Sequence, residues 1–178
     1  PMKELFSLLH NLPALQEVGE TLSSGQSLLA ECLPASAKAF FCSYAKDISR
    51  KSLLILTGTG SEEFQLYNDL PFFAKDSIIE LPAWETLPTE NIAPSPDVVG
   101  ARYKALQQIS QAKEPIIVLT TLQGALQKLV QKNTVKNEFL IFENGQKCQF
   151  DVLIHSFLNM GYERKNIVTD KGEFAVRG

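Results

Sequence analysis

Three short apolar runs, each followed by a stretch with helical periodicity, constrain the fold of this chain more than any other feature. The runs cover residues 52–57, 77–81 and 115–120. The segments that follow them place apolar side chains about every 3.6 residues, which is typical of amphipathic helices. Because apolar strands alternate with helices, we expect a parallel sheet that is joined by helical crossovers and buried on both faces.

The segments around these strands predict several helices. Residues 3–21 predict two short helices separated at Pro13, because proline cannot continue a helix. Residues 28–32 are expected to extend the helical region, and residues 35–48 form an amphipathic helix. After the first strand, Ser61 is expected to cap a helix with its apolar side chains facing inward, namely Phe64, Tyr67 and Leu70.

The loop after the middle strand holds the only tryptophan of the chain, Trp84. Pro82 cannot donate a ladder hydrogen bond, so the strand should end there, and Ser95 or Asp97 should cap the next helix. A stiff loop at the carboxyl end of a strand lies where ligands bind in open α/β sheets. The residues alone favour the simpler interpretation, in which Trp84 fills the edge of the sheet.

The last of the apolar runs is followed by a helix that Thr121 should cap, and the sequence pattern changes after residue 133. We expect a second, smaller α+β unit from about residue 136. Its predicted elements are strands over 138–142 and 146–149 joined by a tight turn at Asn144-Gly145, a helix over 151–160 that ends at Gly161, and strands over 164–169 and 173–177.

Composition excludes several classes of function. The net charge of −3 gives no overall attraction to nucleic acid. The three cysteines, Cys32, Cys42 and Cys148, lack the spacing of a zinc site and are expected to be buried thiols in a reducing compartment. The two histidines, His10 and His155, are far apart, so no metal is expected. Without a membrane-spanning run or a convincing signal peptide, we expect a cytoplasmic location.

A glycine-rich turn, Thr57-Gly58-Thr59-Gly60, follows the first strand in the way that phosphate loops do. A working phosphate loop also needs a lysine before the helix, and here Ser61, Glu62 and Glu63 follow instead. Two carboxylates would repel a nucleotide, so we interpret the segment as a simple strand-to-helix turn. We identify no catalytic residues, no cofactor-binding residues and no metal ligands in the chain.

The last 17 residues combine cations with aromatic side chains. Arginine beside an exposed aromatic residue is typical of the energetic centre of a protein–protein interface. The alternative is a pair of ordinary charged edge strands, which resist aggregation, and the residues alone favour it. The cations that could converge on one face of a small sheet, beside Tyr162 and Phe174, are Arg164, Lys165, Lys171 and Arg177.

Three motifs together resemble the N-terminal, UvrB-like region of bacterial transcription-repair coupling factors (Mfd). They are Trp84-Glu85-Thr86-Leu87-Pro88, Pro94-Ser95-Pro96-Asp97 and the terminal Gly172-Glu173-Phe174-Ala175-Val176-Arg177-Gly178. The resemblance covers nearly the whole chain. It implies a helicase-like α/β domain with a degenerate phosphate loop over residues 1–135, and the beginning of a UvrA-binding domain over residues 136–178. Residues 23–29 lie where the phosphate loop would be, and Trp84, Glu85, Pro88 and Asp97 would form the structural loop.

The resemblance also implies a function in recruitment. The fragment would bring the excision-repair protein UvrA to lesions where RNA polymerase has stalled, with Arg164, Arg177 and Phe174 in the contact. A further arginine of the family falls on Ala175, so part of the contact set is absent. The parent protein would be an ATP-dependent DNA translocase that displaces the polymerase. Its ATP and magnesium site, its DNA and polymerase contacts, and a C-terminal region that masks the UvrA-binding surface would lie in downstream parts.

Two other functions remain open at this point. A UvrB-like nucleotide-binding helicase fragment would carry a tyrosine-rich hairpin, whereas residues 84–94 form a short segment without tyrosine. A small-molecule α/β enzyme would need a deep pocket with converging polar groups beside Trp84.

Overall fold

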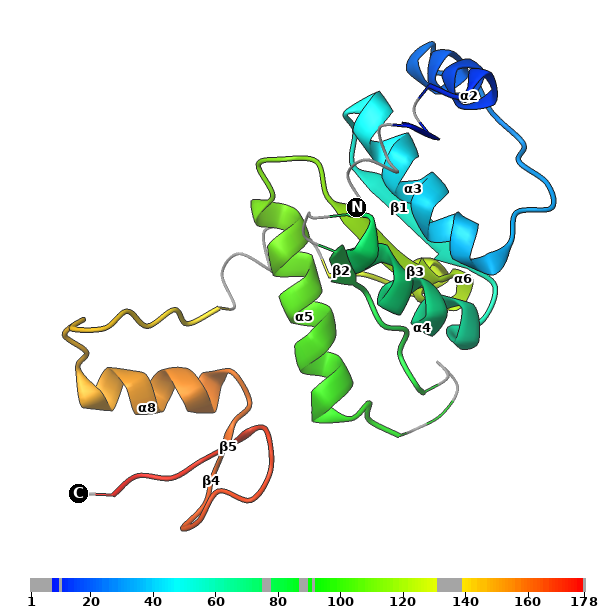
Figure 1. Ribbon diagram of the computed structural model, residues 1–178. Helices are drawn as coiled ribbons and strands as arrows, with labels where there is room; N and C mark the ends of the chain where they lie inside the picture. Colours follow the sequence, from blue (N-terminus) through cyan, green and yellow to red (C-terminus); the bar gives the residue numbers. More distant parts are fainter. Residues whose placement is uncertain are drawn as a thin grey trace.

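The computed structural model describes residues 8–9, 11–74, 78–86, 90, 92–130 and 139–177. Figure 1 shows a larger unit around a sheet and a smaller C-terminal unit. The elements in chain order are α2 (Pro13–Ser23), α3 (Ala35–Ser49), β1 (Leu53–Thr57), α4 (Gly60–Asp69), the 3-10 helix η1 (Leu70–Phe72), β2 (Ile78–Glu80), α5 (Pro96–Gln111), β3 (Ile117–Thr121), α6 (Leu122–Leu126), α8 (Phe150–Asn159), β4 (Glu163–Arg164) and β5 (Glu173–Phe174).

The larger unit contains a parallel sheet with the strand order β1-β3-β2. Its register pairs Leu53 with Ile117 in one ladder and Ile79 with Val118 in the other. After β2, the backbone N–H of Leu81 donates one more bond to the carbonyl of Leu119, at 2.9 Å. Pro82 follows without an N–H, so the predicted end of this strand is confirmed. A small parallel sheet flanked by helices confirms the α/β prediction.

Helices cover the two faces of the sheet unequally. On one face, α3 and α4 pack with Ile55, Ile117 and Leu119 into the first part of the core. On the other face, α5 packs over β2 and β3 through Ala105 and its neighbours. The expected burial on both faces is therefore wrong for β1. Its Leu54 and Leu56 remain 58% and 49% exposed, because α5 does not extend over this edge strand.

Helix α4 differs from the prediction in its cap and in its buried face. Thr59, rather than Ser61, is the N-cap, and its side chain accepts a bond from the Glu62 N–H at 3.3 Å. The buried residues of α4 are Glu63 and Leu66, whereas Phe64 is 71% exposed. Tyr67 is also exposed and only Leu70 of the predicted inward set is buried. Leu66 and Leu70 fill the core together, and Glu63 shares their stripe three residues before Leu66.

The N-terminal helical region is partly as predicted. Helix α2 begins at Pro13, where the sequence predicts a break, and ends at Ser23, two residues before Gly25, whose φ of 75° is left-handed. The predicted helix over residues 28–32 is wrong, since residues 25–34 contain no helix. Helix α2 packs against α3, and the Tyr44 hydroxyl donates to the carbonyl of Leu15.

The thiols are less buried than expected. All three cysteines are free, and Cys32 and Cys148 are exposed, so the prediction of burial is wrong for both. Cys42 lies on α3 against the first part of the core and is half-buried. Burial raises the pKa of the Cys42 thiol.

The C-terminal unit keeps its predicted helix and turn but not its predicted hairpin. Helix α8 ends at Asn159, and Gly161 follows its C-cap as predicted, with a φ of 86° and an N–H that donates to the carbonyl of Leu158. The Asn144-Gly145 turn is present, but residues 139–142 and 146–149 contain no strand. The strands β4 and β5 are shorter than predicted and pair in parallel. The boundary expected at residues 135–136 lies outside the described residues.

Candidate functional site

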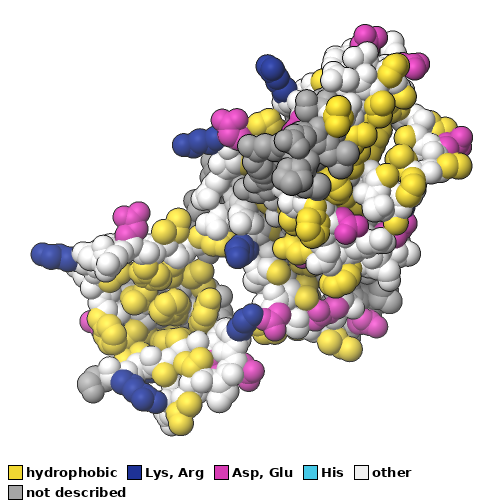
Figure 2. All heavy atoms as spheres, in the orientation of Figure 1, with side chains coloured by type: hydrophobic (Ala, Val, Ile, Leu, Met, Phe, Trp, Pro, Cys, Tyr) yellow, Lys and Arg dark blue, Asp and Glu magenta, His cyan; other side chains and the backbone are white. Residues whose placement is uncertain are grey.

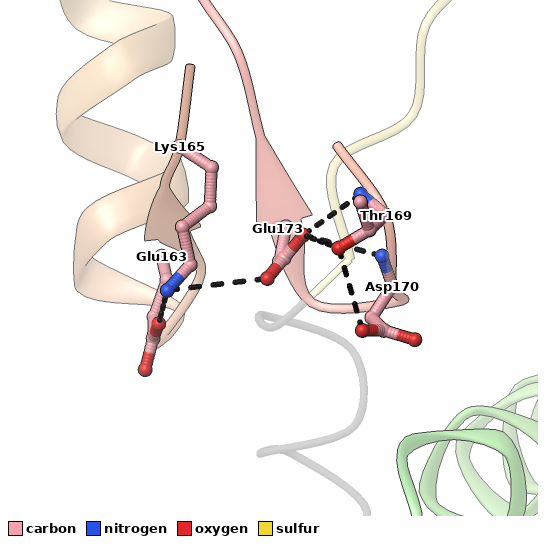
Figure 3. Close-up of polar contacts among 5 residues, drawn as sticks. All are labelled: Glu163, Lys165, Thr169, Asp170 and Glu173. Carbon is pink, nitrogen blue, oxygen red and sulfur yellow. Dashed lines mark hydrogen bonds and ion pairs between the residues drawn. The ribbon is translucent and has the colours of Figure 1, made fainter. Parts of the chain in front are cut away.

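A glutamate on β5 organises the loop that joins the two short strands of the C-terminal unit (Figure 3). Oε2 of Glu173 accepts hydrogen bonds from the Thr169 N–H at 2.9 Å, the Thr169 hydroxyl at 3.1 Å and the Asp170 N–H at 3.2 Å. Oε1 lies 4.0 Å from the Lys165 ammonium. These backbone donors favour the ionised carboxylate and lower the pKa of Glu173.

Lysine 165 is held by the same group of residues. Its ammonium lies 2.7 Å from Oε2 of Glu163, and this bond and charge raise the pKa of Lys165. Figure 3 shows Glu163, Lys165 and Glu173 turned toward one another. We call Glu163, Lys165, Thr169, Asp170 and Glu173 the Glu173 cluster.

The cations of the C-terminal segment do not converge as the sequence suggests. Lys165 is bound within the Glu173 cluster, and the ammonium of Lys171 pairs with the carboxylate of Asp97 at the start of α5. Successive side chains of a strand point to opposite faces, so Arg164 is separated from Glu163 and Lys165. In the parallel register, Arg164 lies opposite Phe174.

The two arginines predicted to contact a partner, Arg164 and Arg177, are both exposed. Within the described residues, neither guanidinium takes part in an ion pair or a hydrogen bond. An exposed guanidinium without an internal partner keeps its full set of donors for an incoming carboxylate. These side chains are therefore the free cations of the described part of the C-terminal segment.

Phe174, predicted as a third contact, lies inside the C-terminal unit and is only 9% exposed. Its ring centre is 5.4 Å from that of Phe157 on α8, and Phe157 also lies 5.3 Å from Tyr162. The three rings form a small aromatic core under the strand pair. Phe174 thus packs beneath the strand pair instead of lying on its surface. The sequence could not show this, because an apolar residue can be either buried or an exposed contact.

The C-terminal unit also presents an apolar surface. Helix α8 has no fully buried residue among those described, and Figure 2 shows hydrophobic side chains gathered over this unit. Exposed apolar residues beside arginine are typical of protein–protein contacts. The large apolar side chains of the unit that are half or more exposed are Ile141, Phe142, Phe150, Val152, Ile167 and Val168.

The Trp84 loop is fixed by groups from two helices. The guanidinium carbon of Arg102 lies 4.5 Å from the centre of the Trp84 ring. The side chain of Gln127 accepts from the Trp84 N–H at 2.6 Å and donates to the Trp84 carbonyl at 3.1 Å. The Glu85 carboxylate accepts from the Ser95 N–H at 2.7 Å, and Ser95 is the N-cap of α5. These contacts hold the half-buried Trp84 against α5 and the residue after α6.

The sequence predicts that Trp84, Glu85, Pro88 and Asp97 form a structural loop. In the structure, only some of these residues make contacts within the loop. Glu85 joins the loop to the start of α5, whereas Asp97 points to Lys171 instead. Pro88 lies outside the described residues. Arg102 and Gln127 were not singled out. The sequence does contain a signal for Arg102. It lies four residues after Val98 and three before Ala105, so this cation shares a helix face with apolar residues and is expected to be buried.

The glycine-rich turn after β1 uses its own carboxylate as a ligand. Oε2 of Glu62 accepts a bond from the Gly58 N–H at 3.2 Å, while Thr59 caps the Glu62 N–H. In phosphate loops, backbone N–H groups at this position face the anion. The other candidate segment, residues 23–29, begins at the last residue of helix α2 rather than after a strand.

The described residues contain neither a metal-binding cluster nor a membrane-spanning helix. No group of three or more histidine, cysteine, aspartate or glutamate side chains could hold a metal ion among them. Among the described helices, none combines the length and the hydropathy that crossing a bilayer requires.

Known proteins provide two lines of comparison. The family model described as the UvrB interaction domain matches residues 140–178. The transcription-repair-coupling factor of Mycobacterium bovis is 31% identical over 185 residues, which covers 100% of this chain and 15% of that protein. The factor of Rickettsia bellii is 27% identical over 154 residues, with 85% and 14% covered. The factor of Staphylococcus epidermidis is 26% identical over 166 residues, with 92% and 14% covered.

The chain therefore spans about 15% of the length of the curated relatives that it matches. The family model falls on the segment that contains α8, β4 and β5, so the sequence similarity and the predicted interaction segment coincide. The chain therefore corresponds to the N-terminal region of transcription-repair coupling factors, and its residues 140–178 match the UvrB interaction domain.

Proposed function

We propose that this chain recruits UvrA, and that the segment containing β4 and β5 makes the contact through the exposed side chains of Arg164 and Arg177. The observation that supports this proposal most directly is the pair of exposed guanidinium groups without internal partners, in a segment that matches the UvrB interaction domain. In this proposal, the chain binds a partner and has no catalytic role of its own.

The chemistry of the two arginines suits such a contact. A guanidinium group binds a carboxylate through two parallel hydrogen bonds, which provides geometric specificity as well as energy. Arg164 and Arg177 need break no internal ion pair before they bind. Lys165 and Lys171 would have to leave carboxylates that they already contact, so they contribute less in this proposal.

The proposal assigns a supporting role to the larger unit. We propose that it is a helicase-like domain with a degenerate phosphate loop that binds no nucleotide. The absence of lysine from residues 23–29 and the use of the Gly58 N–H by Glu62 support this view. In the full-length parent, an ATP-dependent DNA translocase, the ATP and magnesium site and the contacts with DNA and RNA polymerase would lie elsewhere. A C-terminal region of the parent would mask the UvrA-binding surface.

Titration of purified UvrA against this chain tests the proposal. Arg177→Ala removes charge-assisted bonds at a desolvated contact and should weaken binding by roughly 2–5 kcal/mol. Lys147→Ala is the matched control, because Lys147 is an exposed cation of the same unit that forms no ion pair with another described residue. Equal affinities of the wild type and Arg177→Ala would refute the assigned contact.

Calorimetry with ATP and magnesium tests the assignment of the larger unit. We expect no binding heat from the isolated chain, because the N–H groups and the lysine that a nucleotide needs are either occupied or missing. Saturable heat at micromolar nucleotide would favour a nucleotide-binding helicase fragment instead.

A further inference from the structure

The strands that carry Arg164 and Phe174 are too short to hold their own register. Each of β4 and β5 contains 2 residues, and they pair through two ladder bonds. The Glu163 N–H donates to the Gly172 carbonyl at 2.8 Å, and the Lys165 N–H donates to the Phe174 carbonyl at 2.9 Å. Isolated two-stranded pairs are marginal in water, so other contacts must fix this arrangement.

The Glu173 carboxylate provides further contacts, both to the loop between the two strands and to Lys165, which follows β4 (Figure 3). Its Oε2 accepts three hydrogen bonds from Thr169 and Asp170, in the loop that returns the chain from β4 to β5. Its Oε1 approaches the ammonium of Lys165, the residue after Arg164. Glu173 itself lies between Gly172 and Phe174, whose carbonyls accept both ladder bonds.

This geometry connects Glu173 to the proposed interface without a direct contact. The side chain of Glu173 is 16% exposed and all its bonds are internal, so it presents little of itself to a partner. The two neighbours of Arg164, Glu163 and Lys165, donate their backbone N–H groups to the carbonyls of the two residues that flank Glu173. These bonds fix the backbone of Arg164. Arg177 lies shortly after β5, the strand that begins with Glu173.

We propose that Glu173 is a positioning residue, whose carboxylate fixes the loop of residues 165–172 and thereby presents Arg164 and Arg177 to an acidic surface of the partner. This inference rests on the proposed function, because it assumes that the two arginines contact UvrA. A partner surface with carboxylates is the complement of two guanidinium groups that lack internal partners.

A double-mutant cycle with UvrA titration tests the inference. Glu173→Ala should weaken UvrA binding by about tenfold, because ordering the loop then costs binding free energy. The control is Glu143→Gln, which removes one exposed carboxylate charge from the same unit but lies outside the Glu173 cluster and outside β4 and β5. We expect the control to stay within about twofold of the wild type.

The cycle separates positioning from direct contact. If Glu173 acts through Arg164, Glu173→Ala should cost much less in the Arg164→Ala background than in the wild type. Equal costs in both backgrounds would show that Glu173 acts independently of Arg164 and would overturn the proposal. Weaker binding by Arg164→Ala and Arg177→Ala with no effect of Glu173→Ala would also overturn it, but would leave the UvrA contact standing. No effect of any arginine variant would refute the proposed function itself.

A local measurement on the unbound chain completes the test. Hydrogen exchange at the Thr169 and Asp170 amides should accelerate in Glu173→Ala and remain slow in Glu143→Gln. Glu173→Gln keeps an acceptor oxygen without the charge and should rescue part of both the protection and the affinity. If Glu173→Ala unfolds α8, as judged by circular dichroism, Glu173→Gln provides the comparison. Unchanged amide exchange in Glu173→Gln and Glu173→Ala would overturn the proposal.

Discussion

The guanidinium group of Arg102 lies over the ring of Trp84, with 4.5 Å between the guanidinium carbon and the ring centre. Arg102 is 1% exposed, and its Nη1 donates to the Pro82 carbonyl and, at 3.5 Å, to Gln127. Burial lowers the pKa of Arg102, but a guanidinium group remains charged in proteins. One buried cation thus joins the end of β2, the Trp84 loop and the residue after α6.

Replacing this cation should destabilise the larger unit. Arg102→Ala removes the bonds to Pro82 and Gln127 and leaves a cavity beneath Trp84, so we expect a loss of about 2–5 kcal/mol in the free energy of unfolding. Urea denaturation monitored by Trp84 fluorescence measures it. Lys104→Ala, on the exposed face of the same helix, is the control and should change stability by less than about 0.5 kcal/mol. Equal midpoints for the two variants would contradict this role of Arg102.

Two glycines should respond in opposite directions to alanine. A Cβ atom at Gly124 would lie 2.4 Å from Oγ1 of Thr120, which donates to the Leu81 carbonyl at 2.7 Å, so Gly124→Ala should cost about 1–3 kcal/mol. A Cβ atom at Gly100 in α5 meets nothing within 4 Å, so Gly100→Ala should stabilise the helix by about 0.5–1 kcal/mol. Thermal unfolding of both variants measures the contrast, which loss of stability in both would contradict.

Glu63 should make the stability of the larger unit depend on pH. Burial, and then the charge of Glu80, raise the pKa of Glu63, and its Oε1 has no hydrogen-bond partner. A raised pKa in the folded state favours the protonated form. The stability contributed by Glu63 is therefore complete below the ordinary glutamate pKa and is lost as the pH rises through the raised value.

The variant Glu63→Gln should consequently be more stable than the wild type at neutral pH. The difference should vanish below the ordinary pKa of glutamate, where both side chains are neutral. Melting temperatures measured across the acid range test this, with Glu114→Gln as the control because Glu114 is exposed. A constant difference between wild type and Glu63→Gln at every pH would show that charge is not the cause.

Glu173 should show the opposite dependence on pH. The N–H donors of Thr169 and Asp170 lower its pKa, so its contribution is present above the ordinary glutamate pKa. That contribution is lost as the pH falls through the lowered value. Exchange at the Thr169 and Asp170 amides, corrected for the intrinsic effect of pH, should accelerate in that range. The other charges facing Glu173 belong to Lys165, Glu163 and Asp170, and Glu173→Gln should lack the transition if Glu173 causes it.

Local signals in the sequence predicted much of the larger unit. The three apolar runs became β1, β2 and β3, and the helix caps at Ser95 and Thr121 lie where residue type predicts them. These features depend on neighbouring residues, which a sequence displays directly. The buried face of α4 could not be predicted this way. Glu63 is buried and Phe64 is exposed because of the way the helix packs on the sheet, which the local sequence does not specify.

The candidate site was predictable in its residue types but not in its arrangement. Arg164 and Arg177 were identified through a resemblance, and their exposure without internal partners agrees with a role in binding. The positions of Phe174 and Lys165 depend on the parallel pairing of two very short strands, which no periodicity reveals. The prediction of a hairpin over residues 138–149 was wrong for a related reason. Its turn depends on neighbouring residues, whereas the pairing of its strands depends on contacts that the local sequence does not specify.

The unequal exposure of the three thiols has a practical consequence for spectroscopy. Thiolates are the reactive form, and burial raises the pKa of Cys42, so a maleimide dye should label Cys32 and Cys148 first. Cys32 precedes α3 in the larger unit, and Cys148 precedes α8 in the smaller one. A donor and an acceptor fluorophore on these natural positions would report the separation of the two units in solution, with and without UvrA, in a chain that keeps its native sequence.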